Sequence, residues 1–323
     1  MQKMLYREAV CQALDEEMAR DKNVFNIGED VGIIGGNFKC TKGLMEKYGD
    51  LRCKDSPIAE QGFIGMCVGA AIRGLRPVAE LMFGDFMFVC FDQIANQMAK
   101  ITYMSGGKVH VPMTIRMPIG GGRSSAAQHS QTPITMVANM PGMKVVMPSN
   151  GYEAKGLLKT AIRDNNPVIF MEHKMMYTTE CEIPDEEYLI PFGKANVARE
   201  GTDITVVATS IMVGFALKAA EELAKDGISV EVIDLRTIVP WDKETVIKSV
   251  KKTGKLLVVD EGHESFGISG EICLKVMQET FYDMDAPVMR MGTKDVPLPF
   301  SPALEFPIIP DAKKIMAQIK EMV

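Results

Sequence analysis

The segment at residues 55–82, DSPIAEQGFIGMCVGAAIRGLRPVAELM, carries the pattern that decides the fold. Small and apolar side chains fill residues 63–72, as expected for a helix buried along one face. Gly74 follows this stretch, and then comes the short apolar run at residues 78–82, which is typical of a buried strand. A helix that leads directly into an apolar strand indicates a parallel sheet, because such strands are covered by helices on both faces.

The same alternation of strand and helix patterns continues in both directions along the chain. At 323 residues, the chain exceeds the size at which one hydrophobic core usually stops growing. We therefore predict an α/β protein with two parallel-sheet domains, at residues 1–180 and 200–323, joined by a polar linker at residues 181–199. Strands are expected at residues 24–27, 78–82, 111–116, 144–147, 168–171, 204–208, 230–233 and 256–259, helices at 5–19, 63–72, 85–103, 152–163 and 216–225, and a loop at 117–132.

Composition and charge restrict the function classes. The formal net charge is -6 and no long run of Lys or Arg occurs, which argues against nucleic acid or an anionic membrane as the main partner. No apolar stretch approaches the roughly 20 residues that span a bilayer. The seven cysteines are scattered without a Cys-x-x-Cys pair, and the N-terminus has no apolar signal core. These features predict a cytoplasmic protein with reduced thiols.

Glu60 stands immediately before the helix, among small and apolar residues. A carboxylate in such surroundings is desolvated, so its proton affinity should rise unless a cation or a hydrogen-bond donor faces it. The commonplace alternative is a helix-start carboxylate that interacts with backbone N–H groups, and the segment alone favours that alternative. The glycines at residues 62, 65 and 69 share one face of the helix, which predicts close approach of another helix there.

His129 lies in the non-periodic segment GGGRSSAAQHSQ at residues 120–131, and the chain has only four histidines. A loop imidazole suits proton transfer to a substrate, although an ordinary surface histidine explains the pattern almost equally well. His263 follows another predicted strand and ranks behind His129. Dinucleotide-binding, P-loop, metalloprotease and nucleophile-elbow motifs are all absent.

Four strings in the observed order carry a family resemblance: IAEQGF at residues 58–63, YMSGG at 103–107, AAQHSQ at 126–131 and AIRDNNP at 161–167. Together they resemble the β subunit of the thiamine-diphosphate-dependent first component of the pyruvate, branched-chain 2-oxo acid and acetoin dehydrogenase complexes. The resemblance covers nearly the whole chain. It implies a transketolase-like pyrimidine-binding domain followed by a transketolase C-terminal domain.

The resemblance also implies roles for individual residues. Glu60 would be the carboxylate that bonds the aminopyrimidine ring of the cofactor, with Met82 and Phe86 packed around that ring. His129 resembles the active-site histidine that assists reductive acylation of the lipoyl group. A structural potassium site would be built mainly from backbone carbonyls, and its matching residues are Met113, Ala161, Ile162, Asp164 and Asn166.

Members of this family bind the cofactor's diphosphate and Mg²⁺ through a Gly-Asp-Gly segment, which this chain lacks. The missing half of the site is therefore expected on an α subunit, in an α₂β₂ assembly docked on a dihydrolipoyl acyltransferase core. The run at residues 132–138, TPITMVA, departs from the family's usual aromatic continuation and leaves pyruvate, acetoin or another 2-oxo acid open as the substrate. Half of a split transketolase, a decarboxylase without a lipoyl partner, and a non-catalytic assembly subunit remain as alternatives.

Overall fold

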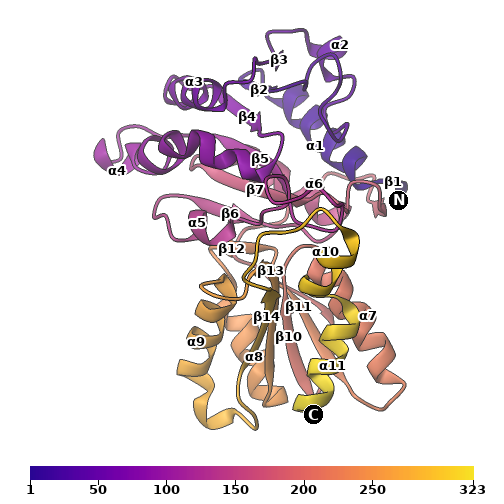
Figure 1. Ribbon diagram of the computed structural model, residues 1–323. Coiled ribbons are helices and arrows are strands. Elements are labelled where there is room, and N and C mark those ends of the chain that lie inside the picture. Colours follow the sequence, from indigo (N-terminus) through magenta and orange to yellow (C-terminus); the bar gives the residue numbers. More distant parts are fainter.

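The computed structural model describes all 323 residues as two stacked α/β units (Figure 1). The N-terminal unit is built on a seven-stranded sheet and the C-terminal unit on a five-stranded one. Parallel pairing dominates both sheets, and only the edge pairs β12–β6 and β11–β9 are antiparallel. The predicted α/β class with two mostly parallel sheets is confirmed.

The seven-stranded sheet places the carboxyl ends of its central strands at one edge. Its order is β12 (Thr237–Val239), β6 (Lys144–Val146), β7 (Val168–His173), β5 (Thr114–Ile119), β4 (Arg76–Glu80), β2 (Val24–Gly28) and β3 (Cys53–Asp55). The helical elements of this unit are α1 (Tyr6–Arg20), α2 (Leu44–Tyr48), α3 (Glu60–Ile72), the 3₁₀ helix η1 (Gly84–Cys90), the π-helix η2 (Gln93–Met98), α4 (Ile101–Met104), α5 (Ile134–Ala138) and α6 (Gly151–Arg163). Helices α1 and α6 pack against each other, whereas α3 packs against η1 and η2.

The five-stranded sheet has the order β14 (Met289–Thr293), β13 (Leu256–His263), β10 (Ile204–Ala208), β11 (Val230–Asp234) and β9 (Asn196–Arg199). Its helical elements are α7 (Ile211–Ala224), α8 (Lys243–Thr253), α9 (Ile268–Thr280), η3 (Phe281–Asp283), α10 (Pro302–Ile308) and α11 (Ala312–Met322). Asp242 caps α8, because its side chain accepts a hydrogen bond from the backbone N–H of Thr245 at 3.2 Å. None of the helices is long and apolar enough to cross a membrane.

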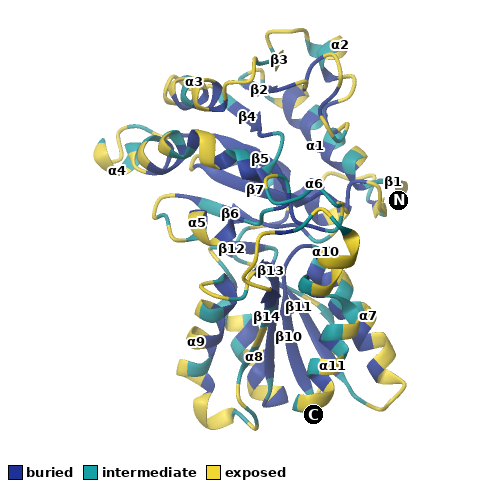
Figure 2. Ribbon diagram, viewed as in Figure 1, coloured by how far each residue is buried: buried dark blue, intermediate teal, exposed yellow.

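The two units are joined through the largest of three hydrophobic clusters. The largest cluster of buried side chains includes Ile115 of β5 in the N-terminal unit and Val258 of β13 in the C-terminal unit. Strand β12 belongs to the C-terminal half of the sequence but completes the N-terminal sheet. Buried residues accordingly run through both sheets and across the junction between them (Figure 2). The packing therefore fixes how the carboxyl ends of the two sheets face each other.

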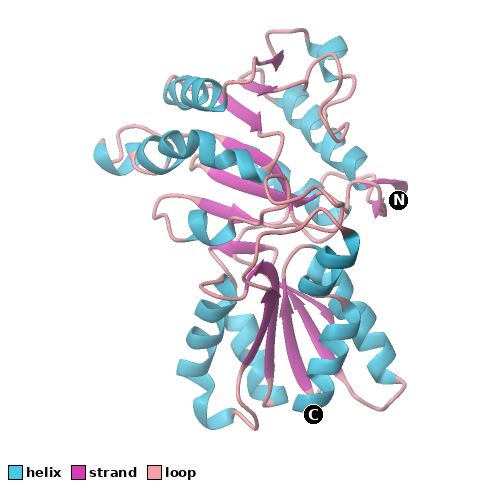
Figure 3. Ribbon diagram, viewed as in Figure 1, coloured by secondary structure: helices cyan, strands magenta, loops and turns pink.

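Two predicted segments differ most from the structure (Figure 3), and the strand expected at residues 111–116 lies three residues later, so that it takes in the first three residues of the predicted loop. The long helix expected at residues 85–103 is instead divided into η1, η2 and α4. Asp85 accepts two hydrogen bonds from Gln131, so tertiary contacts hold the start of this segment and override its helical pattern. The passage expected to be a linker contains the strands β8 (Glu180–Ile183) and β9; β8 pairs with β1 (Gln2–Leu5), and β9 lies at the edge of the five-stranded sheet.

Candidate active site

Glu60 begins α3 close to the carboxyl edge of the seven-stranded sheet. The residue is only 6% exposed, and no hydrogen bond within the chain engages its carboxylate, whose oxygens keep slight contact with solvent. The preceding Ala59 provides no side-chain cap for the helix. A buried carboxylate without a partner is costly unless something outside the chain satisfies it. Glu60 is thus available to a ligand rather than used for helix capping.

A second carboxylate faces the same region and was missed in the sequence. Glu29 directly follows β2, is 6% exposed, and has a carboxylate oxygen without a hydrogen-bond partner. Burial, with the nearby charges of Glu60 and Asp30, raises the pKa of Glu29 to about 7. Two under-satisfied carboxyl groups at one sheet edge can share a proton with a bound nitrogen base. The signal available in the sequence was the position of Glu29 at a strand end, where sites gather in parallel sheets.

Met82 and Phe86 lie beyond β4, at the same sheet edge. Met82 precedes η1 and Phe86 lies within it, and both side chains are half-buried. The ring of Phe86 meets the ring of Phe83 edge-to-face, with centroids 5.8 Å apart. An aromatic and a thioether side chain at this position form a surface against which a planar heterocycle can pack.

His129 joins this aromatic group from the loop that follows β5. Its imidazole lies 4.8 Å from the Phe83 ring and 5.5 Å from the Phe86 ring, edge-to-face in both cases. The backbone oxygen of His129 accepts a hydrogen bond from the ammonium group of Lys174. Burial lowers the pKa of Lys174 to about 8. The structure therefore brings His129 and Phe86 together, as the sequence analysis expected of residues in one site.

A buried ionic network supports the strands beneath the site. The guanidinium of Arg116 on β5 pairs with Glu80 on β4 at 2.7 Å and with Glu172 on β7 at 2.7 Å. Tyr177 also donates a hydrogen bond to Glu172 at 2.6 Å. Since Glu80 lies two residues before Met82, this network fixes the strand ends from which the site residues emerge.

The residues matched to a potassium site gather at two neighbouring places. Ala161 and Ile162 lie in the last turn of α6, and Asp164 and Asn166 in the turn that follows. Met113 precedes β5, and its backbone oxygen accepts a hydrogen bond from the N–H of Val168 at 2.9 Å.

Two positively charged side chains of the protein already contact some of the oxygen atoms that would bind a potassium ion. Arg76 donates to the backbone oxygens of Ile162 and Asp164 at 3.0 and 2.9 Å, and the ammonium group of Lys144 pairs with the Asp164 carboxylate. The oxygen ligands for a potassium ion are therefore present, but the ion would share them with the side chains of Arg76 and Lys144.

Comparison with known proteins identifies the family. Residues 2–180 match the family described as transketolase, pyrimidine binding domain, and residues 193–315 match transketolase, C-terminal domain. The chain is 45% identical to the 2-oxoisovalerate dehydrogenase subunit beta of Bacillus subtilis (strain 168), over 100% of this chain and 99% of that protein. It is 46% identical to the acetoin:2,6-dichlorophenolindophenol oxidoreductase subunit beta of Cupriavidus necator, over 99% and 97%. It is 47% identical to the mitochondrial pyruvate dehydrogenase E1 component subunit beta of Homo sapiens, over 98% and 89%.

The chain belongs to the β subunits of the 2-oxo acid and acetoin dehydrogenases. Among solved structures, a split gene transketolase described as an inactive beta4 tetramer superimposes with a TM-score of 0.80 at 24% identity, covering 99% of this chain and 98% of that one. That likeness shows the fold alone. The resemblance read from the four sequence strings is confirmed, as is the expected transketolase-like architecture.

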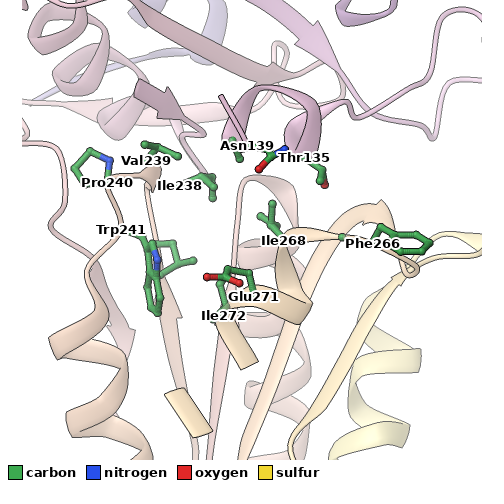
Figure 4. A pocket seen from close by; sticks show the side chains of 13 residues that line it. Thr135, Asn139, Ile238, Val239, Pro240, Trp241, Phe266, Ile268, Glu271 and Ile272 are labelled. Atoms are coloured by element: carbon green, nitrogen blue, oxygen red, sulfur yellow. The ribbon is translucent and has the colours of Figure 1, made fainter. Parts of the chain in front are cut away.

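Residues 132–138, which the sequence analysis expects to depart from the family's usual pattern, lie at the junction of the two units. Their last residues form α5, and Thr135 borders a cavity of about 500 Å³ between the two units (Figure 4). The opposite wall includes Trp241 and the side chains of Ile268 and Ile272 on α9. None of the predicted site residues lines this cavity, so it is separate from the candidate active site.

Proposed function

We propose that this chain is the β subunit of a thiamine-diphosphate-dependent dehydrogenase component that cleaves pyruvate or acetoin and transfers the acyl group to lipoamide. The similarity to β subunits of this kind over the full length supports the reaction class. The single observation within the molecule that carries the proposal is the Glu60 carboxylate, which belongs to a residue only 6% exposed and accepts no hydrogen bond from the chain. An acyl-transferring component of a multienzyme complex needs such a group to activate its cofactor.

The residues of the site fit the pyrimidine half of thiamine diphosphate. When bound, the cofactor supplies a thiazolium carbon that attacks the carbonyl group of the substrate. Glu60 would hold a proton against a ring nitrogen of the aminopyrimidine, and Glu29 would provide a second buried carboxyl group, whose pKa is raised. Met82 and Phe86 would supply the apolar surface for the ring, and His129, which lies beside Phe86, would assist reductive acylation of the lipoyl group.

The chain would supply only half of each cofactor site. It has no Gly-Asp-Gly segment to hold the diphosphate and Mg²⁺, so we infer that an α subunit carries them. The outer face of α3 leaves room for such a partner. Nothing lies within 4 Å of the position that a Cβ at Gly69 would take, and Met66 on the same helix is exposed. We propose an α₂β₂ assembly that docks on a dihydrolipoyl acyltransferase core in the cytoplasm.

We also propose a structural K⁺ at the turn after α6, held by backbone oxygens of Met113, Ala161 and Ile162 with Asp164 and Asn166. Arg76 and Lys144 share these donors, which lowers the attraction for a further cation. The ion is therefore expected to bind weakly and to stabilise the turn rather than take part in the reaction.

The test of the proposed function compares the chain alone with the chain co-purified with its α subunit. Calorimetric titration with thiamine diphosphate and Mg²⁺ should show tight binding only for the pair. Steady-state assays with pyruvate, acetoin and branched 2-oxo acids should then show lipoamide reduction with one preferred substrate. Tight binding by the chain alone, or sugar-phosphate transfer without lipoamide reduction, would contradict the proposal; the second result would indicate half of a split transketolase.

A further inference from the structure

The histidine loop (residues 120–131) is held at its start by two buried carboxylates of the C-terminal unit. The backbone N–H of Gly121 donates to Glu261 Oε1 at 2.6 Å. The N–H groups of Gly122 and Ser124 donate to the two carboxylate oxygens of Glu305 at 2.8 and 2.9 Å. Glu305 is 0% exposed and Glu261 7%, so water competes little for these hydrogen bonds. Hydrogen bonds to a charged acceptor are also stronger than neutral ones.

The glycines at the start of the histidine loop allow it to press against the C-terminal unit. A Cβ at Gly121 would lie 2.5 Å from Ile309 Cδ1 and 2.6 Å from Leu298 Cδ2, both in the C-terminal unit. Gly120 has a φ of +92°, and a Cβ there would overlap the imidazole of His173. Larger residues would push the loop away from both carboxylates.

Two consecutive residues at the end of β7 contribute contacts to the start of the histidine loop and to His129 near its end. His173 Nε2 lies 2.6 Å from Glu261 Oε2, while its Nδ1 accepts a hydrogen bond from the N–H of Met175 at 3.2 Å. The Nε2 side of the ring thus faces the carboxylate that holds Gly121. The next residue, Lys174, donates to the backbone oxygen of His129. The end of β7 thus contacts both Glu261, which holds the start of the loop, and the backbone of His129 near the end of the loop.

We propose that Glu261 and Glu305 are positioning residues, through which the C-terminal unit holds the histidine loop so that the His129 imidazole stands beside Phe83 and Phe86. Neither carboxylate would touch the substrate. Their buried charge would act on the backbone of the loop and, through it, on the geometry of His129. The catalytic part of this inference rests on the proposed function, whereas the mechanical part rests on the contacts alone.

The mechanical part is tested by hydrogen–deuterium exchange of the full-length chain in the assembly it forms when purified. Glu305→Gln keeps one acceptor oxygen but turns an NH₂ group towards the second backbone N–H. Exchange in peptides covering the histidine loop should become roughly tenfold faster or more, because at least one hydrogen bond to a charged acceptor is lost. The matched control is Glu279→Gln, an exposed carboxylate of the same unit that pairs with Lys243, and it should leave loop exchange unchanged.

Loop exchange within twofold of wild type in Glu305→Gln would overturn the proposal. An equal rise in exchange throughout the C-terminal unit would also overturn it, because the carboxylate would then be only a general stabiliser. If Glu305→Gln does not fold, Glu261→Gln provides the same test, since it leaves Glu305 in place and should loosen the loop around Gly121.

The catalytic part is tested by measuring the rate of lipoamide reduction by the same variants. Loosening the loop should lower kcat for acyl transfer to lipoamide while KM for the 2-oxo acid stays within twofold. A parallel change of kcat and KM would overturn the positioning role. If the wild-type assembly itself reduces no lipoamide, the proposed function fails, and the exchange result alone decides whether the two carboxylates hold the loop.

Discussion

Replacing Arg116 by Met should destabilise the chain more than any exposed charge change. Arg116 is 1% exposed and bonds Glu80 and Glu172, each at 2.7 Å, so the substitution leaves two buried carboxylates without their cation. Methionine keeps the apolar stem of the side chain but not the guanidinium group, so the space that this group leaves adds to the electrostatic loss. Removing one partner of a buried pair typically costs about 3–5 kcal/mol, and here two carboxylates lose the same partner.

The free energy of unfolding of Arg116→Met should therefore fall by at least about 3 kcal/mol, measured by urea denaturation at neutral pH. The loss should be smaller at lower pH. Burial raises the pKa of Glu80 even beside Arg116, and removal of that cation should raise it further, so the penalty of the unpaired carboxylate is absent at low pH and grows as the pH rises. The control is Lys225→Met, which breaks an exposed pair with Glu222 and should cost no more than about 1 kcal/mol.

A loss below about 1 kcal/mol for Arg116→Met, or a loss that does not depend on pH, would refute this reasoning. It would mean that the two carboxylates find other partners or stay protonated even with Arg116 in place. Adding Glu80→Gln and Glu172→Gln to Arg116→Met should restore part of the stability, because no buried charge then remains unpaired.

Three further outcomes are expected. Burial raises the folded-state pKa of Glu29 to about 7, so its contribution to stability is present below its unfolded pKa and is lost as the pH rises through 7. Glu29→Gln should therefore resist urea better than wild type at pH 8 but not at pH 5. An equal gain at both pH values would contradict this. Gly120→Ala should lower the free energy of unfolding by about 2 kcal/mol or more, whereas Gly69→Ala, with open space around its Cβ, should not lower it. Replacing NaCl by KCl at equal concentration should raise the melting temperature slightly, and no difference would argue against the K⁺ site at Asp164.

Much of the fold could be predicted because the strands and most helices have hydrophobic patterns that are visible in short stretches of the sequence. The runs at residues 24–27, 144–147 and 168–171 are strands in the structure, within one or two residues at each end. The failure at residues 85–103 has a tertiary cause. Hydrogen bonds from Gln131, which is distant in sequence, hold Asp85, and no helical period can show that contact.

The candidate site was predictable only in part, for the same reason. Glu60 and His129 could be singled out from residue type and local context, and the roles given to them stay predictions. For Glu29 the sequence offers only its position at a strand end, because its raised pKa comes first from burial and then from the charge of Glu60, and both arise only in the folded chain. The carboxylates of Glu261 and Glu305 belong to another unit of the fold, and nothing in the histidine loop itself indicates them.

The most direct test of the central claim is lipoamide reduction by Glu60→Gln in the assembly with the α subunit. Glutamine preserves size but cannot share a proton as a carboxylate does, so the rate should fall by a factor of roughly 100 or more. Glu46→Gln, an exposed carboxylate on α2, is the matched control and should retain wild-type activity. Wild-type activity in Glu60→Gln, with the complex intact, would contradict the account and indicate that this chain is a non-catalytic assembly subunit.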